Sequence, residues 1–507
     1  MSRIFYYLIR NRQDFFGGLS LKGLIFTILI ALGFGLSIPF AGVFQWEFGE
    51  VIDIHNILPD YAPYYIFGII GLAIMVACFV KPVLGIFFFT AFLPFRSEDY
   101  TIIDISGAEI RIADFFILPA IVGWALNRIF VERKGLKFES TGAETSFLFF
   151  FWWCALSMAW TYSKSGTVSK LVQLVYSIII VFMIIDTIKT KKSLNFIFVG
   201  WLIGGILLSA AGIMEKFSEE GRAESVNTSP LETGEYLNYP VLIAFGLFFT
   251  LKSKWLKTIV LGSILIFILG SLVSGSRGPL LGMAAGIFFF WIFSKEMKRF
   301  SYWAIGAIMF ATISAFIMFF IMNLSQRDII DNFTAPFERF IDLFETQYKP
   351  DIGEVYRIAI WQGIWEIFKR NPIFGIGVGA LPEILPDYVT KVFQDPTLAH
   401  NIYLEVLIAV GPFGFMLFLW FVANIIKIIK PLLRTKDSTL RLISLGLTGA
   451  LIAQAVGGLT FGLFFENRVL STTIGMLLAV SIITRNTEKA LYELPQRDAE
   501  KDKATCY

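Results

Sequence analysis

Long apolar runs separated by short polar segments make up most of the chain. A helix needs about 20 apolar residues to cross a bilayer, because each residue rises about 1.5 Å and lipid cannot bond to loose backbone groups. About 12–14 runs meet or approach that length. They lie near 23–45, 62–80, 82–96, 113–131, 146–161, 170–187, 194–214, 236–252, 256–274, 279–295, 301–323, 401–428, 440–464 and 468–485. The pattern therefore predicts an all-α, polytopic integral membrane protein.

Two neighbouring runs are unusually close together. The run 82–96 is short, and only Lys81 and Pro82 separate it from the run 62–80. We therefore expect these two runs to form either a bent hairpin or a re-entrant pair.

Composition supports the membrane prediction and excludes a soluble multidomain protein. Hydrophobic residues make up 56% of the chain and charged residues only 16%, and the mean hydropathy is +0.68. The 54 Phe and 12 Trp suit lipid-facing helices with aromatic belts at the headgroups. Because Cys78 and Cys154 lie in apolar runs and Cys506 lies in a charged tail, no disulfide framework is expected.

Basic residues gather in alternate connecting segments of the predicted topology. Examples are the clusters within 133–137, 189–192, 252–257, 295–299 and 427–436. Lys and Arg stay on the cytoplasmic side during insertion, so we place these segments and the N-terminus inside. A single path that alternates between the two sides of the membrane then agrees with the charge of every loop, and it places both termini in the cytoplasm.

One polar segment, about 324–400, is much longer than the others and falls on the predicted outer face. Loops above about 15 residues are usually functional or separately structured. Asp351 and Glu354 have the spacing of a capping box, and the Trp-rich stretch 355–368 follows them. We therefore expect an extracytoplasmic loop that contains an interfacial helix, and we look there first for function.

The segment from Ser274 to Pro279 connects two predicted spans on the outer side. Gly278 suits a helix cap and Pro279 suits the first helical position, so an outward-facing helix N-terminus is expected. Such an end presents free N–H groups and about half a positive charge, and Arg277 beside it makes a site suited to phosphate. Small residues such as Ser276 favour close approach by a ligand or another helix. The alternative is a tight hairpin whose arginine reaches lipid headgroups.

The chain has two histidines, and His400 directly precedes Asn401. Asn401 can cap the helix that follows, and the positive end of that helix disfavours imidazolium. Since the ordinary pKa of histidine is about 6.5, His400 would be neutral near pH 7 and able to accept a proton. The alternative is an interfacial histidine that only forms hydrogen bonds. His55 lies among acidic residues in the first outer loop and is interpreted as a surface residue.

Arg357 and Arg222 also fall on the predicted outer side. At helical spacing Arg357 shares a face with Trp361 and Ile364. This predicts either amphipathic anchoring or a second cation for a lipid-linked phosphate. Arg222 lies in a shorter outer loop with several polar residues, where it could contact a polar ligand.

Several chemistries lack the residues that they need in this sequence. No His/Cys cluster fits zinc, no Gly-x-x-x-x-Gly-Lys loop fits ATP, and no Asp-x-Asp pair fits a metal-bound nucleotide sugar. The stretch Gly375 to Gly379 resembles a nucleotide loop only superficially, because it follows a helix and a proline rather than a strand. Glu98 and Asp99 could hold a cation, although adjacent carboxylates in a loop are usually solvated. We expect no metal and no cofactor.

Three sequence pieces in the second half of the chain carry a resemblance when they are taken together. They are Ser-x-Ser-Arg-Gly at Ser274 to Gly278, Arg357-x-x-x-Trp361 followed by Asn371-Pro372-x-x-Gly375-x-Gly377, and His400-Asn401-x-x-Leu404 followed by Gly411-x-x-Gly414. In this order and spacing the chain resembles the O-antigen ligase and O-antigen polymerase superfamily of bacterial membrane glycan transferases. The stretch from Gly221 to Tyr236 is similar to the loop that precedes these pieces in the family.

The resemblance implies a glycosyltransferase of the C-type class that works without a metal or other cofactor. Such an enzyme moves a glycan from a polyprenyl-diphosphate-linked donor to an acceptor hydroxyl of a glycan or a lipid-linked molecule. His400 corresponds to the family's essential histidine, and Arg277 and Arg357 correspond to its diphosphate-binding arginines. Arg222 is a further binding arginine. His400 is expected to activate the acceptor while the arginines stabilise the departing diphosphate, with inversion at the anomeric carbon.

The remaining expectations concern binding, location and organisation. Ser276 and Asn401 are further candidates for substrate binding. The resemblance implies a multi-pass protein of the bacterial inner membrane with its active site facing the periplasm, in contact with membrane lipids and not with nucleic acid. The predicted domains are N-terminal transmembrane helices over 1–200, a catalytic membrane region over 201–485 and a cytoplasmic tail over 486–507.

Three functions follow from these expectations in descending order. The first is a ligase that joins a polymerised glycan to lipid A-core or a related outer acceptor. The second is a polymerase that extends the repeat unit and needs the same leaving-group site. A transporter or flippase of lipid-linked sugars ranks lower. Such proteins commonly show two related halves and charged residues at mid-membrane depth, and the sequence shows neither feature.

Overall fold

The computed structural model of the protein describes residues 62–95, 101–105, 108–133, 135, 138–218, 229–302, 352–389, 398–461, 464–465 and 467–504. The predicted run 23–45 and nearly all of the run 301–323 lie outside these residues. So do Arg222, His55 and the pair Glu98 and Asp99.

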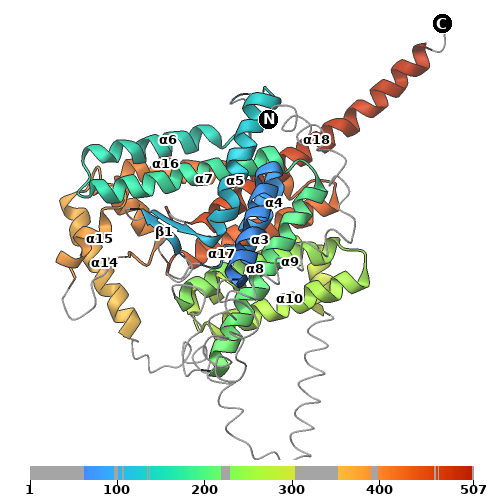
Figure 1. Ribbon diagram of the computed structural model, residues 1–507. Helices are drawn as coiled ribbons and strands as arrows, with labels where there is room; N and C mark the ends of the chain where they lie inside the picture. The colour runs from blue at the N-terminus through green and yellow to red at the C-terminus, as the bar shows by residue number, and fades with distance from the viewer. Residues whose placement is uncertain are drawn as a thin grey trace, which may run out of the picture. The chain divides into compact units, whose positions relative to one another are not determined.

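The regular structure of the described residues is helical apart from one β-hairpin (Figure 1). The helices are α3 (Ala62–Val80), α4 (Pro82–Phe92), α5 (Ile112–Leu126), α6 (Glu144–Leu156), α7 (Lys164–Thr187), α8 (Lys191–Ser218), α9 (Pro230–Thr250), α10 (Lys254–Val273), α11 (Arg277–Phe293), α14 (Ile352–Arg370), α15 (Leu381–Ile384), α16 (Ile402–Leu432), α17 (Ser438–Gly457) and α18 (Arg468–Ala504). Strands β1 (Thr101–Ile105) and β2 (Ala108–Arg111) pair antiparallel, with Thr101 opposite Arg111.

Seven described helices are long and apolar enough to cross a membrane. They are Ile112–Val131, Lys164–Thr187, Lys191–Glu215, Lys254–Val273, Ile402–Leu432, Ser438–Gly457 and Arg468–Lys489. A bent pair, Arg277–Phe293 with Lys295–Tyr302, makes an eighth candidate that turns by 106° at its break. The predicted all-α, polytopic membrane fold is therefore confirmed. The total of about 12–14 spans stays a prediction.

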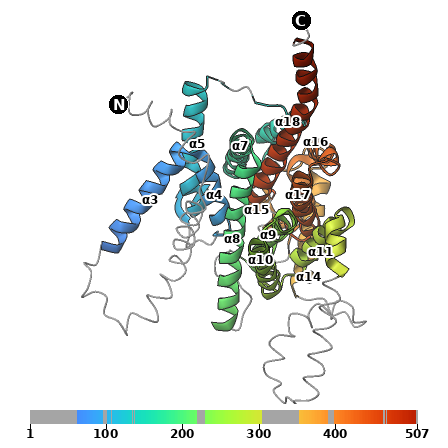
Figure 2. The same cartoon turned by 90° about the vertical axis from the view of Figure 1, so that its right-hand side faces the viewer.

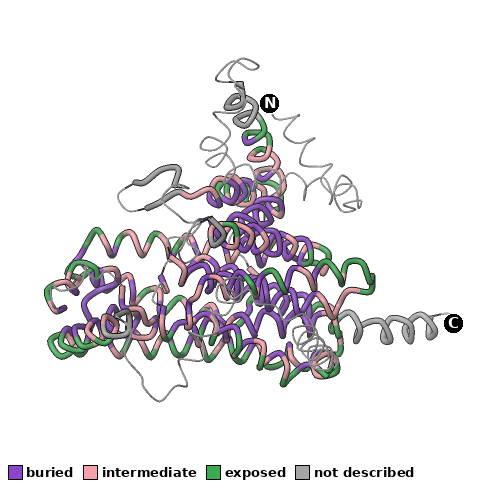
Figure 3. Tube along the Cα trace, turned by 90° about the horizontal axis from the view of Figure 1, so that it is seen from below, coloured by how far each residue is buried: buried purple, intermediate pink, exposed green. Residues whose placement is uncertain are grey.

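Apolar side chains on the outer faces of these helices fit a lipid environment. On α16, Phe413, Met416, Leu419 and Trp420 are all exposed. Figure 3 shows how exposed positions alternate with buried ones along the helices, as expected where one side packs on protein and the other faces lipid.

The chain divides into two compact units that interleave along the sequence. Unit 1 comprises 1–141, 175–236 and 468–507, and unit 2 comprises 142–174 and 237–467. Two of the four divisions fall within helices α7 and α9, and the other two lie directly before α18 and just before α6. The domain boundaries expected from the sequence stay predictions.

In unit 1 the short helix α4 is buried along nearly its whole length. At about 1.5 Å per residue it is too short to cross the bilayer. Small residues allow its close packing, because a side chain at Gly85 would meet the Phe116 carbonyl of α5 at 2.9 Å and one at Gly200 of α8 would meet the Phe87 carbonyl at 2.6 Å. These dimensions favour the re-entrant alternative for the pair α3 and α4.

A buried ionic contact joins three helices of unit 1. Arg468 at the start of α18 lies 2.6 Å from the Asp114 carboxylate of α5, and the Tyr176 hydroxyl of α7 donates to the same carboxylate. Both charged side chains are largely buried. Pairing lowers the cost of holding charge in an apolar environment, so this contact orders the helix ends that it joins.

In unit 2, helices α11 and α17 pack closely through small residues (Figure 2). Gly278, Gly282 and Gly286 recur every fourth residue along α11. A Cβ at Gly286 would lie 2.7 Å from the Gly449 carbonyl of α17, and one at Gly282 would lie 2.5 Å from the Ala453 carbonyl. This spacing lets two membrane helices approach to backbone distance.

Candidate functional site

The predicted interfacial helix is present as α14, which spans Ile352–Arg370 and ends directly before Asn371. Its inner face carries Ile360, Ile364 and Ile367, which are buried in a hydrophobic cluster with residues of the segment 376–389. On the other side Trp365 is exposed. The helix is therefore amphipathic, and its packing fixes the direction of the side chains that it carries, including the half-buried Arg357.

The start of α16 is capped by Asn401, as the sequence predicts. The Asn401 Oδ1 accepts hydrogen bonds from the backbone N–H groups of Tyr403 at 3.0 Å and Leu404 at 3.1 Å. Its Nδ2 donates to the Leu459 carbonyl at 3.2 Å. Both ends of the amide are thus used within the protein. The substrate-binding role of Asn401 stays a prediction.

Directly before this cap, His400 has a left-handed backbone with φ of 48°. Its ring is half-buried, and its centroid lies 6.2 Å from that of Tyr356 on α14 at an interplanar angle of 65°. The Nδ1 atom is buried and makes no hydrogen bond to any described residue. A buried nitrogen left in this way is costly in a structural residue and is often found at functional sites.

The surroundings of His400 keep its imidazole neutral. Burial, and then the positive charge of Arg357, lower the pKa of His400 to about 4. The sequence predicted neutrality from the positive end of α16, and the direction is the same although the causes are different. At pH 7 the ring therefore has a free lone pair and lies within electrostatic reach of a guanidinium.

Helix α14 also holds the peptide that precedes His400. The Trp361 Nε1 donates to the Ala399 carbonyl at 3.0 Å. Ala399 is buried, and it belongs to the same hydrophobic cluster as the inner face of α14. One helix therefore supplies the arginine that lowers the pKa of His400 and an indole that bonds to the peptide before it.

The glycines of the segment Gly375 to Gly379 form a tight turn that follows α14. Gly375, Gly377 and Gly379 all have positive φ, a backbone conformation that glycine adopts readily. The turn packs on α16, since Ile376 N–H donates to the Ile408 carbonyl at 2.9 Å and Gly377 N–H donates to the Ala409 carbonyl at 3.0 Å.

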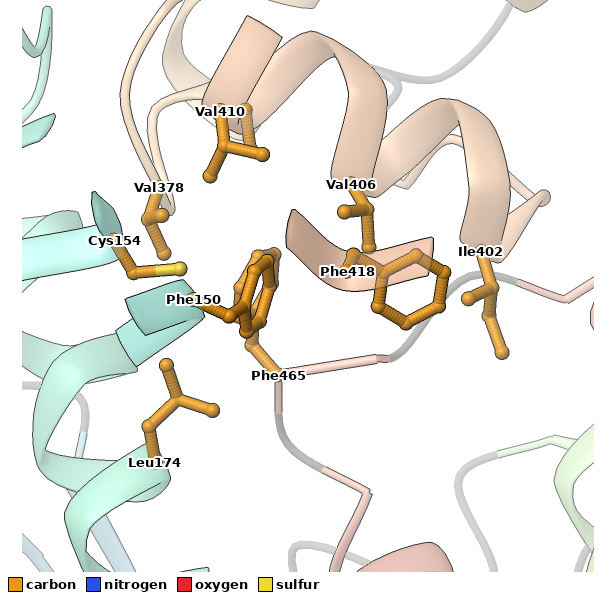
Figure 4. Close-up of a cluster of buried hydrophobic side chains, with 10 residues drawn as sticks. Phe150, Cys154, Leu174, Val378, Ile402, Val406, Val410, Phe418 and Phe465 are labelled. Carbon is orange, nitrogen blue, oxygen red and sulfur yellow. The ribbon is translucent and has the colours of Figure 1, made fainter. Parts of the chain in front are cut away.

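These bonds lie where α16 breaks and its first half, Ile402–Val410, ends. Gly411 is non-helical, with φ of 69°, and Pro412 follows it. The break frees carbonyl groups that the glycine turn and the Trp153 indole, 2.8 Å from the Val410 carbonyl, then satisfy. The half-helix Ile402–Val410 also packs into a hydrophobic cluster that Figure 4 shows, so His400 stands on a short, rigid support.

The segment around Arg277 forms a turn between α10 and α11. Gly275, with φ of 62°, ends α10, and its N–H donates to the Leu272 carbonyl at 2.9 Å. Helix α11 begins at Arg277 with Ser276 in the cap position. The prediction that Pro279 is the first helical residue was therefore wrong by two positions, because the glycine bend comes earlier and a proline fits anywhere in a first turn that has free N–H groups.

Ser276 occupies the cap position of α11 without capping it. Its hydroxyl lies 3.5 Å from the Ser274 carbonyl and makes no capping hydrogen bond to the first turn of the helix. Arg277 is half-buried and is the first helical residue. The substrate-binding role of Ser276 and the diphosphate-binding role of Arg277 stay predictions.

The turn that follows α17 brings the starts of α11 and α16 to the same place. Its Gly458 carbonyl accepts from Ile402 N–H at 2.8 Å, and its Leu459 carbonyl accepts from Asn401. The next residue, Thr460, is so close to Gly278 that a Cβ added at Gly278 would collide with the Thr460 hydroxyl. The two residues after His400 and the residue after Arg277 therefore contact one continuous turn.

The structure thus brings together most of the predicted site residues. His400 and Arg357 interact electrostatically, and Arg277, Ser276 and Asn401 lie at the two helix starts that meet at the turn of residues 458–460. Arg222 lies outside the described residues. Over the described ranges no three His, Cys, Asp or Glu residues group as metal ligands, and metal independence stays a prediction.

Sequence reasoning missed the turn at 458–460 and the indole bond of Trp361. The doublet Gly457-Gly458 after an apolar run was a local sign of a tight turn. The residues that contact this turn, Asn401 and Gly278, lie about 60 and about 180 residues earlier in the chain. For Trp361 the sequence showed only a shared helix face with Arg357. Nothing in the sequence indicated the carbonyl that it meets.

The described residues form a helical, multi-pass membrane protein in which a neutral histidine lies within electrostatic reach of an arginine. Residues 262–419 match the family model described as O-Antigen ligase. This match supports the O-antigen ligase superfamily, and the resemblance read from the sequence is confirmed. The family supports a membrane glycan-transfer enzyme that acts on lipid-linked glycans. No curated protein matches the chain.

Proposed function

We propose that this protein is an O-antigen ligase that transfers a glycan from a polyprenyl-diphosphate-linked donor to an acceptor hydroxyl at the outer face of the inner membrane. The observation that carries the proposal is the neutral His400 held beside Arg357, at the end of unit 2 where α11 begins with Arg277. A base and two cations are the groups that such a transfer requires.

In the proposed reaction the acceptor hydroxyl oxygen attacks the anomeric carbon of the donor sugar. His400 accepts the hydroxyl proton while the bond between that carbon and the diphosphate oxygen breaks, and the diphosphate leaves with the bonding electrons. Direct displacement of this kind inverts the anomeric carbon. The low pKa of His400 keeps the base unprotonated at pH 7, although it also makes the base intrinsically weak.

Because the base is weak, most of the rate acceleration in this proposal comes from stabilising the departing diphosphate. Arg277 and Arg357 would neutralise the diphosphate, and the first N–H groups of α11 supply further donors for its oxygens. Arg222 is proposed as a third cation. With the charge carried by side chains and helix N–H groups, the reaction needs no metal ion.

Ser276 and Asn401 act near the substrate in this proposal. Ser276 flanks the first N–H groups of α11, where a diphosphate oxygen would approach its hydroxyl. Asn401 caps the helix start that directly follows His400, which would bring it near the acceptor hydroxyl.

The proposed orientation places this end of unit 2 in the periplasm and both termini in the cytoplasm. The starts of α11 and α16 share one turn, which agrees with a single alternating path through the membrane. Nucleotide sugars are made inside the cell, so a donor used on the outer side must arrive on a lipid carrier.

Glycan analysis of a deletion strain tests the proposal. The strain should accumulate polymer on polyprenyl diphosphate and lose polymer from lipid A-core, and the wild-type chain should restore the linkage. Single repeat units would instead identify a polymerase. Normal glycan on lipid A-core together with unchanged carrier-linked intermediates would overturn both forms of glycan transfer.

A further inference from the structure

His400 is one of only two described residues other than glycine with a positive φ, and its value is 48°. Only a few per cent of such residues adopt this conformation, and it persists only where the surrounding structure enforces it. The contacts that enforce it identify residues that act on the histidine without touching the substrate.

Bonds on both sides of His400 fix its backbone. Before it, the Ala399 carbonyl accepts from the Trp361 indole at 3.0 Å. After it, Asn401 Nδ2 donates to Leu459 and Ile402 N–H donates to Gly458 at 2.8 Å. The first contact comes from α14, and the other two come from the turn that follows α17.

Trp361 differs from the other contacts because its helix also carries Arg357. The two residues are four positions apart, so they lie on one face of α14. The far end of the half-helix is also joined to the segment that follows α14, through Ile376 and Gly377. Trp361 therefore supplies the connection to α14 at the His400 end of the half-helix, and the segment after α14 supplies the connection at the far end.

We propose that Trp361 is a positioning residue whose indole N–H, by holding the Ala399 carbonyl, keeps His400 in its left-handed conformation and at a fixed position against Arg357. This inference rests on the proposed function, since it concerns how the proposed base is oriented. Without the indole N–H, the buried Ala399 carbonyl loses its partner, and the peptide before His400 is free to turn toward a more common conformation.

The test compares Trp361→Phe with a matched control, Trp160→Phe. Each variant loses one hydrogen bond of 3.0 Å from an indole N–H to a backbone carbonyl, but the control bond, from Trp160 to Phe374, is exposed and does not involve a residue next to His400. Transfer from a synthetic polyprenyl-diphosphate glycan is measured with equal amounts of folded protein. Trp361→Phe should lower kcat by tenfold or more with little change in KM for the donor, whereas Trp160→Phe should behave as wild type.

A second measurement reports on His400 without enzyme activity. Since the chain has only two histidines, a His55→Gln background leaves a single labelled imidazole for NMR titration. In this background the His400 ring should titrate at about 4. Trp361→Phe should move the titration upward toward the ordinary value of about 6.5, because the released ring leaves its buried position, while Trp160→Phe should not.

A Trp361 replacement by 3-benzothienylalanine, which keeps the ring shape and loses only the N–H group, covers the case in which Trp361→Phe does not fold. Wild-type kcat in that protein, or a loss of kcat with an unchanged His400 titration, would overturn the positioning role. Full activity of His400→Asn would overturn the proposed function instead, whatever Trp361 does. The two failures are therefore distinguishable.

Discussion

Two helix starts that meet at the turn of residues 458–460 treat their free N–H groups in opposite ways. At the start of α16, Asn401 accepts two of these N–H groups, and the helix end is closed. At the start of α11, Ser276 occupies the same position but its hydroxyl is directed to the Ser274 carbonyl. A helix end without a side-chain cap keeps its donors for an anion, whereas a capped end serves as a fixed platform.

The difference suits the role proposed for each helix. The closed end supports His400, whose usefulness as a base depends on staying neutral and well placed. The open end carries Arg277, so its donors and its cation both suit a phosphate oxygen. The two helix starts therefore differ in whether their first N–H groups are bonded by the residue in the cap position, which is Asn401 in α16 and Ser276 in α11.

The largest effect is expected for the base. His400→Asn should lower transfer by roughly a hundredfold to ten-thousandfold, the usual contribution of general-base catalysis, while the protein still inserts and folds. Asparagine tolerates positive φ better than most residues, so this variant separates chemistry from backbone strain. His400→Ala should be equally inactive. Substantial transfer by purified His400→Asn would remove the general-base assignment.

At the open helix start, Arg277→Lys tests geometry at constant charge. Lysine cannot bind two phosphate oxygens through a planar fork, so transfer should fall by roughly ten- to hundredfold, corresponding to about 1.5–3 kcal/mol of lost contact. The assay uses a synthetic polyprenyl-diphosphate glycan and equal amounts of folded protein. Near-normal activity would mean that Arg277 reaches the lipid headgroups and does not bind two phosphate oxygens.

The electrostatic link between His400 and Arg357 predicts a shifted pH profile. Because Arg357 disfavours the imidazolium, Arg357→Gln should raise the pKa of His400 from about 4, although burial, the larger cause, still keeps it below its usual range. The acid limb of kcat/KM should therefore move to higher pH in the variant. Tyr356, the other group facing the ring, has its own pKa raised by burial and stays uncharged. An unmoved acid limb would mean that another group controls it.

Smaller effects are expected from the two capping positions themselves. Asn401→Ala removes two accepted hydrogen bonds and should destabilise the protein by about 1 kcal/mol. Ser276→Ala removes only a contact of 3.5 Å to the Ser274 carbonyl and should change the unfolding midpoint much less. Thermal unfolding in detergent compares them directly. Equal destabilisation would show that the two helix starts do not differ as described.

The smallest effect is expected from removing metal ions. Transfer should continue at its normal rate in excess chelator, because arginines and helix N–H groups are proposed to balance the diphosphate charge. Loss of activity that magnesium or manganese restores would contradict this and direct attention to Glu98 and Asp99. The measurement is the initial rate with and without chelator at constant ionic strength.

Much of the fold was predictable because its causes are local. Apolar length predicted the membrane helices, since transfer of each side chain into lipid depends little on which segments meet. The Trp-rich stretch predicted α14, and an asparagine before an apolar run predicted the Asn401 cap. The start of α11 was misplaced by two residues, because the chain bends at Gly275, which has positive φ, and enters α11 before the proline.

The sequence by itself therefore determined the membrane class, the order of the helices and the chemical types of the candidate residues. Only the tertiary structure decided that the Trp361 indole bonds to the Ala399 carbonyl, that the pKa of His400 falls mainly through burial, and that the turn of residues 458–460 joins two helix starts. Caps and apolar runs depend on neighbours within about four residues. The site depends on contacts between segments tens to hundreds of residues apart, and close packing decides which of those segments meet.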